Sequence, residues 1–218
     1  NKDPENRYLT RGPRIRLDAE QIRDNALAVS GILNMQLGGP GFRSYQPPNI
    51  WEPVGYGDSN TRYYIQQHGD EIYRRSLYTY FKRTAPPPFM TNWDAPNREM
   101  FCTRRERSNT PLQALQLMND VQHVEAARCL AERLLQQSIS DDEARISRLF
   151  EWVLARQPDT FEREQVSAFL TQCRSRLSTA PDDAQQIATA GERWRDANLP
   201  VEDVATWTLV SNLILNLD

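Results

Sequence analysis

Residues 110–120 read TPLQALQLMND, and residues 121–135 continue as VQHVEAARCLAERLL. Thr110 and Gln113 form a helix-start signature, because Thr is a favoured cap, Pro follows at the first helical position, and Gln closes a capping box. Asp120 then interrupts the first helix and caps a second one, which we expect to run to about residue 137. The stretch therefore predicts two consecutive helices.

The same signals recur through the C-terminal half. Asp141 or Asp142 caps a third helix, Asp159 with Glu162 starts a fourth, and Pro200 opens a last helix after a polar connection. Apolar side chains follow each start at helical spacing. They are Leu112, Leu115 and Met118; Val124, Ala127, Ala131, Leu134 and Leu135; Ile146, Leu149, Phe150, Val153 and Leu154; Val166, Phe169, Leu170, Cys173 and Leu177; and Val204, Trp207, Val210, Ser211 and Ile214.

We expect a mainly α fold in a single domain, 1–218, with a helical bundle over 110–218. A further helix is predicted over 17–37, with a capping box at its start and Gly38-Gly39-Pro40 at its end. Residues 38–109 are rich in Pro and Gly and predict an irregular segment. At most a short β-hairpin is expected there, between TRYYIQQ (61–67) and IYRRSLYTYF (72–81). A short helix is the alternative for its second limb.

Composition excludes several classes of protein. The chain has 218 residues, a net charge of −3 and a mean hydropathy of −0.70. No apolar run is long enough to cross a membrane, and the first 14 residues contain no hydrophobic stretch, so we expect no signal peptide in them. Residues 62–107 carry nine basic and five acidic side chains, whereas residues 108–218 carry ten and seventeen. This balance disfavours nucleic-acid binding. Because the chain also lacks an initiator Met, we expect a fragment of a larger protein.

Arginine and aromatic side chains concentrate in the irregular segment. Guanidinium groups pair with carboxylate, sulfate or phosphate, and aromatic faces stack on sugar rings, so a ligand-binding surface is one interpretation. Structural clamps that pair with the acidic helical half are the other. The candidate ligand residues are Arg74, Arg75, Tyr78, Arg83, Trp93, Arg98, Arg104 and Arg105.

Signals for catalysis are weak. Asp70 and Asp94 could act as acid and base on a polysaccharide if their carboxyl groups lie about 5–10 Å apart. His68 is expected in a tight turn and His123 at a solvated helix start, so we predict no metal site. The three cysteines match no zinc or haem-attachment spacing. Two of them, Cys129 and Cys173, are expected to be buried. The sequence leaves open whether two of the three cysteines form a disulfide bond.

Seven stretches together carry a family resemblance: DPENR (3–7), RLDAEQIRDNALAVSG (16–31), GGP (38–40), YQPPNIW (45–51), YRRSLYTYFKRTAPPP (73–88), DAPNRE (94–99) and TPLQALQLMND (110–120). They resemble the C-terminal domain of unknown function of large secreted planctomycete proteins that also carry cytochrome-c-like modules. The resemblance implies an extracytoplasmic location. It implies upstream domains of the same polypeptide as partners, among them a cytochrome-c-like module. It also implies a missing N-terminal helical segment, so that the first helix would expose an apolar face.

The haem motif of such proteins lies upstream, and none occurs in these 218 residues, so we expect no cofactor in this chain. The function expected is a non-catalytic accessory or interaction domain of a multidomain, cytochrome-linked protein. Its basic-aromatic surface would dock a neighbouring domain or an anionic polysaccharide. A polysaccharide-acting enzyme and a haem-free electron-transfer docking partner are the alternatives.

Overall fold

The computed structural model describes residues 3–10, 12 and 16–217. Within them the chain is helical and contains no strand, which confirms the mainly α fold class. The α-helices are α1 (Ala19–Val29), α2 (Pro88–Asn92), α3 (Pro111–Asn119), α4 (Val121–Leu135), α5 (Asp142–Leu154), α6 (Thr160–Thr179), α7 (Pro181–Ala188) and α8 (Val201–Leu215). Three short 3₁₀ turns lie in the irregular segment: η1 (Glu52–Val54), η2 (Gly69–Tyr73) and η3 (Ser76–Tyr78).

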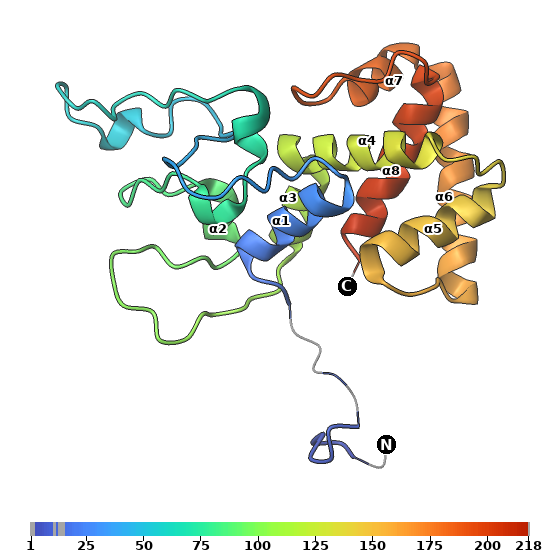
Figure 1. The fold of residues 1–218 in the computed structure, drawn as a ribbon, viewed down its shortest axis with the longest axis horizontal. Coiled ribbons are helices and arrows are strands. Elements are labelled where there is room, and N and C mark those ends of the chain that lie inside the picture. The colour runs from blue at the N-terminus through green and yellow to red at the C-terminus, as the bar shows by residue number, and fades with distance from the viewer. Residues whose placement is uncertain (1–2, 11, 13–15, 218) are drawn as a thin grey trace.

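Helix α8 is the centre of the bundle. It packs against α4, α6 and α7, and Figure 1 shows these helices gathered around it on one side of the molecule. Trp207, Val210 and Ile214 are fully buried in the main core. Their partners come from α4, α5 and α6, and are Leu130, Ala131, Leu134, Ile146, Leu149, Phe150, Val166 and Leu170.

The predicted helix starts are confirmed by their caps. Asp120 accepts hydrogen bonds from the backbone N–H groups of Gln122 and His123 at 3.1 and 3.2 Å. Thr110 and Asp159 each cap a helix with a complete capping box. Each cap satisfies backbone donors that the first helical turn leaves without an internal partner.

Helix α1 ends earlier than predicted. Its last residue is Val29, and Gly31, with φ +80°, turns the chain away. The N–H of Ile32 reaches back to Leu27 O at 3.0 Å and that of Gly31 to Ala28 O at 3.0 Å. This is a Schellman motif, which needs a left-handed residue that Gly adopts without steric cost. The helix prediction over residues 30–37 was therefore wrong, and the Gly-Gly-Pro sequence does not end the helix.

The buried faces of two helices, α1 and α3, differ from those expected from the sequence. The apolar face of α1 is covered, because Ala26 and Leu27 pack against Ile72 and Tyr73. The prediction of an exposed face on the first helix was wrong. On helix α3 the apolar stripe that we predicted to be buried faces outward. Its residues Leu112, Leu115 and Met118 are all more than half exposed. Gln113 and Leu117 are the buried residues of that helix.

Helix α7 lies in what the sequence predicted as a polar connection. Pro181 opens it, and Ala184 and Ala188 are its buried residues. They pack against Val204 and Ala205 of α8. The start of this helix did leave a signal, because Pro181 is followed by Asp182 and Asp183 in the first turn. The sequence-based prediction missed it because its two buried alanines form only a short apolar stripe.

The irregular segment contains no hairpin between 61–67 and 72–81. The second limb forms η2 and η3, in keeping with the short-helix alternative. Residue Phe42 pairs with it instead: its N–H donates to Tyr78 O and its carbonyl accepts from Tyr80 N, both at 2.8 Å. Buried Arg23 of α1 then holds the segment by donating to the carbonyls of Ile72 and Arg74 at 2.6 and 2.8 Å.

Candidate functional site

The loop between α2 and α3 projects from the body of the protein (Figure 1). We call residues 96–107 the projecting loop. At its tip Phe101 is fully exposed and Met100 is 76% exposed. Arg98 and Arg104 on either side are exposed as well. The loop therefore presents two bare apolar side chains, with the exposed carboxylate of Glu99 beside them, between two cations.

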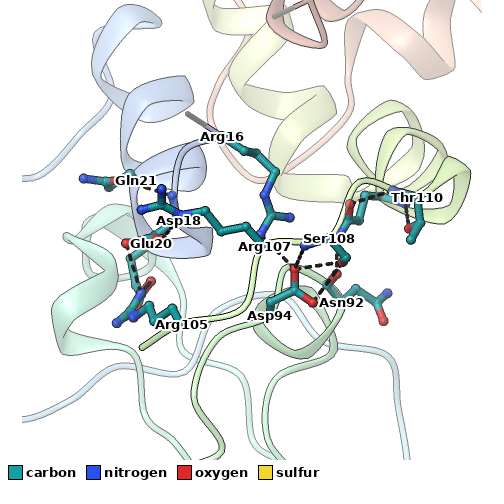
Figure 2. A network of polar contacts seen from close by, with 11 residues as sticks. Arg16, Asp18, Glu20, Gln21, Asn92, Asp94, Arg105, Arg107, Ser108 and Thr110 are labelled. Atoms are coloured by element: carbon teal, nitrogen blue, oxygen red, sulfur yellow. Dashed lines mark hydrogen bonds and ion pairs between the residues drawn. The ribbon is translucent and has the colours of Figure 1, made fainter. Parts of the chain in front are cut away.

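The base of the projecting loop is fastened at Asp94 (Figure 2). The Asp94 carboxylate accepts from the N–H of Ser108 at 2.8 Å, from Ser108 Oγ at 2.8 Å and from Arg16 Nη2 at 2.8 Å. Burial opposes ionisation of this carboxyl, but the hydrogen bonds from Ser108 and Arg16 outweigh it and lower the pKa of Asp94. The two ends of the loop are thus joined through one charged side chain.

A second set of ion pairs ties the loop to the start of α1 (Figure 2). Arg105 donates to both carboxylate oxygens of Glu20, at 2.7 and 3.1 Å. Asp18 lies 3.5 Å from Arg105 and 3.4 Å from Arg107. The hydrogen bond to Glu20 raises the pKa of Arg105. A bidentate Arg–carboxylate pair fixes orientation as well as distance, so this contact holds the returning limb in register.

Ser108 is saturated with hydrogen bonds rather than poised for attack. Its Oγ donates to Asp94 and accepts from Gln113 Nε2 at 2.9 Å. Gln113 is itself buried and also donates to Asn92 O at 2.8 Å. A carboxylate with a lowered pKa is a weak base, so this arrangement does not activate a nucleophile.

A cleft of about 1140 Å³ opens beside the loop base. Arg16 and Trp93 line one side of it, and His123 lies in its wall. His123 is buried and stacks on Phe89 with 5.8 Å between ring centroids. Burial lowers the pKa of His123 to about 4, and the charge of Arg23 adds to this effect. The expectation of a solvated His123 was wrong, because α1 and α2 cover the start of α4.

Arg74 and Tyr78 clamp the backbone of the Gly-Gly-Pro turn. Buried Arg74 donates through Nη1 to Pro40 O at 2.8 Å and through Nη2 to Gly38 O. Its guanidinium lies 4.1 Å from the centre of the Tyr78 ring, and Tyr78 OH accepts from the N–H of Gly38 at 2.8 Å. Arg74 therefore acts as a clamp, but on backbone carbonyls of the irregular segment and not on the acidic helical half, and its buried Nε has no partner among the described residues.

The other candidate ligand residues are scattered. Arg75 lies 3.9 Å from Asp24, and Arg98 stacks 4.6 Å from the centre of the Phe81 ring. Arg83 and Arg104 are exposed, and nothing in the described part of the chain pairs with them. Since Arg74 and Trp93 are buried, the eight residues do not lie on one continuous face.

The two candidate carboxylates are held by different partners. Asp70 has an 82% exposed side chain and pairs with Arg193 at 3.2 Å. Asp94 binds Ser108 and Arg16, so among the described residues the two carboxylates have no partner in common. A general acid needs a raised pKa, whereas that of Asp94 is lowered. The geometry therefore offers no support for an acid–base pair.

Other chemistry is sparse in residues 3–10, 12 and 16–217. No group of three or more His, Cys, Asp or Glu side chains there could hold a metal ion. No helix there is long and apolar enough to span a bilayer. The cysteines are free thiols; Cys129 and Cys173 are buried, as predicted, and Cys102 is exposed in the projecting loop.

The fold and this region define a mainly α-helical domain with an anchored projecting loop. The chain belongs to the family PSD1: Protein of unknown function (DUF1553), which matches residues 1–170. No curated protein and no solved structure matches the chain significantly. The match covers the projecting loop, its anchoring residues and α1 to α5.

Several residues of this region had no place among the sequence-based candidates. Arg16, Asp18 and Glu20 anchor the loop, and Ser108 joins its ends. Their partners lie 14 to 89 residues away in the sequence, so spacing carries no sign of them. Phe101 and Met100 left no distinctive signal either, since the same irregular segment contains the adjacent pair Phe89 and Met90, of which Met90 is buried.

Proposed function

We propose that this protein is a non-catalytic interaction domain and that the projecting loop is its docking element. The observation that carries the proposal is the combination of a bare Met100–Phe101 tip with a base fastened by ion pairs. The partner is a protein surface with an apolar depression bordered by carboxylates. That chemistry complements the tip and the cations of Arg98 and Arg104.

Physical reasons favour binding by a loop of this kind. Aromatic, Met and Arg side chains are enriched in interface cores, and a few such residues account for most of the binding energy. Ordering a loop costs conformational entropy during association. The contacts of Asp94 and Arg105 hold both limbs before binding, which lowers that cost.

The resemblance described from the sequence supports a partner within a larger extracytoplasmic protein, either a neighbouring domain or a cytochrome-c-like module. Docking of such a module would make the chain a haem-free electron-transfer partner. In both cases the same loop would make the contact. The salt dependence would be modest, since the exposed cations of the loop are few.

An anionic polysaccharide is the second candidate ligand. One observation favours it: a surface recess of about 820 Å³ is lined by three arginines, although two carboxylates share the recess. Its lining residues are Asp18, Arg104, Arg105, Glu106 and Arg107. Sulfate or uronate groups would pair there with guanidinium groups.

A displayed random-peptide library tests the main proposal. Peptides are selected on the wild-type protein and removed if they bind a Met100→Ser/Phe101→Ser double variant. We expect the remaining peptides to combine an apolar residue with flanking acids, and to bind at least about tenfold more weakly to Phe101→Ser and Arg104→Glu. Tyr56→Ser is the matched control, because Tyr56 is 87% exposed on a different loop.

Peptides that bind all these variants equally well would refute docking by the projecting loop. Saturable binding of a sulfated or carboxylated polysaccharide, lost in Arg104→Glu and retained in Phe101→Ser, would favour the second candidate. Neutral dextran serves as the control polymer.

A further inference from the structure

We propose that the cleft beside the loop base is a binding site for a small oxyanion-bearing ligand, a carboxylate or a sulfate, recognised by Arg16 and Trp93. This inference is independent of docking by the projecting loop. It rests on donors that the protein leaves without acceptors in a cleft of mixed polarity.

The first observation concerns Arg16. Its Nη2 donates to Asp94 at 2.8 Å, but Nε and Nη1 are buried and find no acceptor among the described residues. A buried guanidinium normally uses its donors, because each one left unmade loses its bonds to water without replacement. Asp94 balances the charge of Arg16, but Nε and Nη1 keep their hydrogen-bonding capacity for a second acceptor.

Trp93 supplies the second observation. It is 7% exposed, its indole Nε1 is buried, and this donor too lacks a partner within the described part of the chain. The Arg16 guanidinium lies 5.1 Å from the centre of the Trp93 ring, so the unpartnered donors belong to two side chains in contact. An indole can only donate, which selects a ligand that accepts.

The cleft lining carries two cations, Arg16 and Arg156, and two carboxylates, Asp159 and Glu162. Arg156, also in the lining, is occupied by Glu162 through two bonds of 2.6 Å. His123 is neutral at pH 7 because its pKa is about 4. Whereas the Arg156 side chain is 42% exposed to water, Arg16 is the lining cation whose buried donors lack acceptors among the described residues. An oxyanion placed there gains a charge-assisted hydrogen bond, which is about twice as strong as a neutral one.

The remaining lining sets the size and character of the ligand. Ile22, Leu117, Val153 and Leu154 form an apolar part, and Asn109 lies in the polar part. A cleft of about 1140 Å³ accommodates a molecule the size of a sugar acid. The ligand class is therefore a compact molecule with one oxyanion group and a less polar body.

The indole N–H signal of Trp93 reports binding in the cleft. The protein has five tryptophans, so its ¹H–¹⁵N spectrum has five indole signals, and Trp93→Phe assigns the relevant one. Sodium glucuronate, acetate and sulfate are titrated separately. Methyl glucoside controls for the sugar body and sodium chloride for ionic strength. We expect a saturable shift of the Trp93 signal with at least one of the three oxyanions and none with the controls.

Variants connect the shift to the cleft. Arg16→Gln should weaken binding by about tenfold or more. Because this change also removes an ion pair to Asp94, Ala114→Phe is the second variant: residue 114 is exposed in the cleft wall, and a ring there narrows the cleft without removing a donor. Arg148→Gln is the matched control, since it removes an equal charge from a residue outside the cleft lining.

Each outcome of the titrations either supports or overturns the proposed site. Loss of the shift in Arg16→Gln and Ala114→Phe, with Arg148→Gln unchanged, supports the site, and the three oxyanions then rank carboxylate against sulfate. No saturable Trp93 shift with any oxyanion overturns it. An equal shift in all variants would also overturn it, since it would show a general charge effect.

Discussion

Gly191 lies directly against the carboxyl group of Glu125. A Cβ placed on residue 191 would lie 2.2 Å from Glu125 Cδ and 2.4 Å from its Oε1. Glu125 is completely buried in α4, and its Oε1 accepts from the N–H groups of Glu192 and Arg193, both at 2.7 Å. The segment before α8 is thereby fastened to the bundle.

We expect Gly191→Ala to destabilise the protein by roughly 3 kcal/mol or more, because a side chain there clashes with Glu125 and the residue has φ +86°. The free energy of unfolding in urea measures this. Gly69→Ala is the control: Gly69 has φ +75° with open space around it, so its cost should be only roughly 1–2 kcal/mol. Equal losses in the two variants would contradict the packing argument.

Tyr73 donates its hydroxyl to the same carboxyl oxygen of Glu125 at 2.7 Å. Tyr73→Phe should therefore lower the free energy of unfolding by about 1.5–3 kcal/mol, the range for a hydrogen bond to a charged group. Tyr56→Phe, at an exposed tyrosine, should leave it unchanged. A neutral effect of Tyr73→Phe would mean that Glu125 finds another donor in the variant.

The burial of His123 should make the free energy of unfolding depend on pH. Its pKa is near 6.5 in the unfolded chain and about 4 in the folded protein. The unfolded state therefore binds the proton first, and stability falls as the pH drops from about 6.5 to about 4. We expect a loss of roughly 3 kcal/mol across this window from this residue alone.

The test compares wild type with His123→Gln in urea at several pH values. The variant should lose less stability between pH 6.5 and 4. Burial raises the pKa of Asp120, which acts in the opposite sense at low pH, and both proteins share that effect. Identical slopes for the two proteins would show that His123 is protonated without unfolding.

Arg74 is a buried arginine that holds backbone carbonyls, whereas Arg104 is an exposed cation, so the same substitution should affect stability differently at the two positions. Arg74→Gln should destabilise the protein by about 2–4 kcal/mol, because the carbonyls of Gly38 and Pro40 lose a buried charged donor. Arg104→Gln should change stability by less than about 0.5 kcal/mol. Thermal unfolding measures both. A stable Arg74→Gln protein would return Arg74 to the list of ligand candidates.

Asp94 should control the order of the projecting loop. Asp94→Asn weakens the bonds to Arg16 and Ser108, so trypsin should cleave after the arginines of residues 96–107 at least several-fold faster than in wild type. Asp58→Asn, at an exposed residue of another loop, is the control. Unchanged cleavage in Asp94→Asn would show that Arg105 and Glu20 suffice to hold the loop.

Local sequence determined where α3, α4 and α6 begin. Thr110, Asp120 and Asp159 cap their own helices, and a cap needs only residues two or three positions away. The apolar residues Trp207 and Val210, expected on the inner face of the last helix, are likewise buried in the core. These features could be read directly because the atoms that interact are close in the chain.

Only the tertiary structure shows which partners the polar side chains bind and which of them are buried. The sequence could not tell whether Arg74 binds a ligand or a carbonyl, because its partners lie 34 and 36 residues away. The same holds for Asp94, whose partner Arg16 is 78 residues distant, and for His123, which is buried by helices remote in sequence. Helix propensity and capping act within a turn, whereas burial and charge pairing depend on which distant segments the fold brings together.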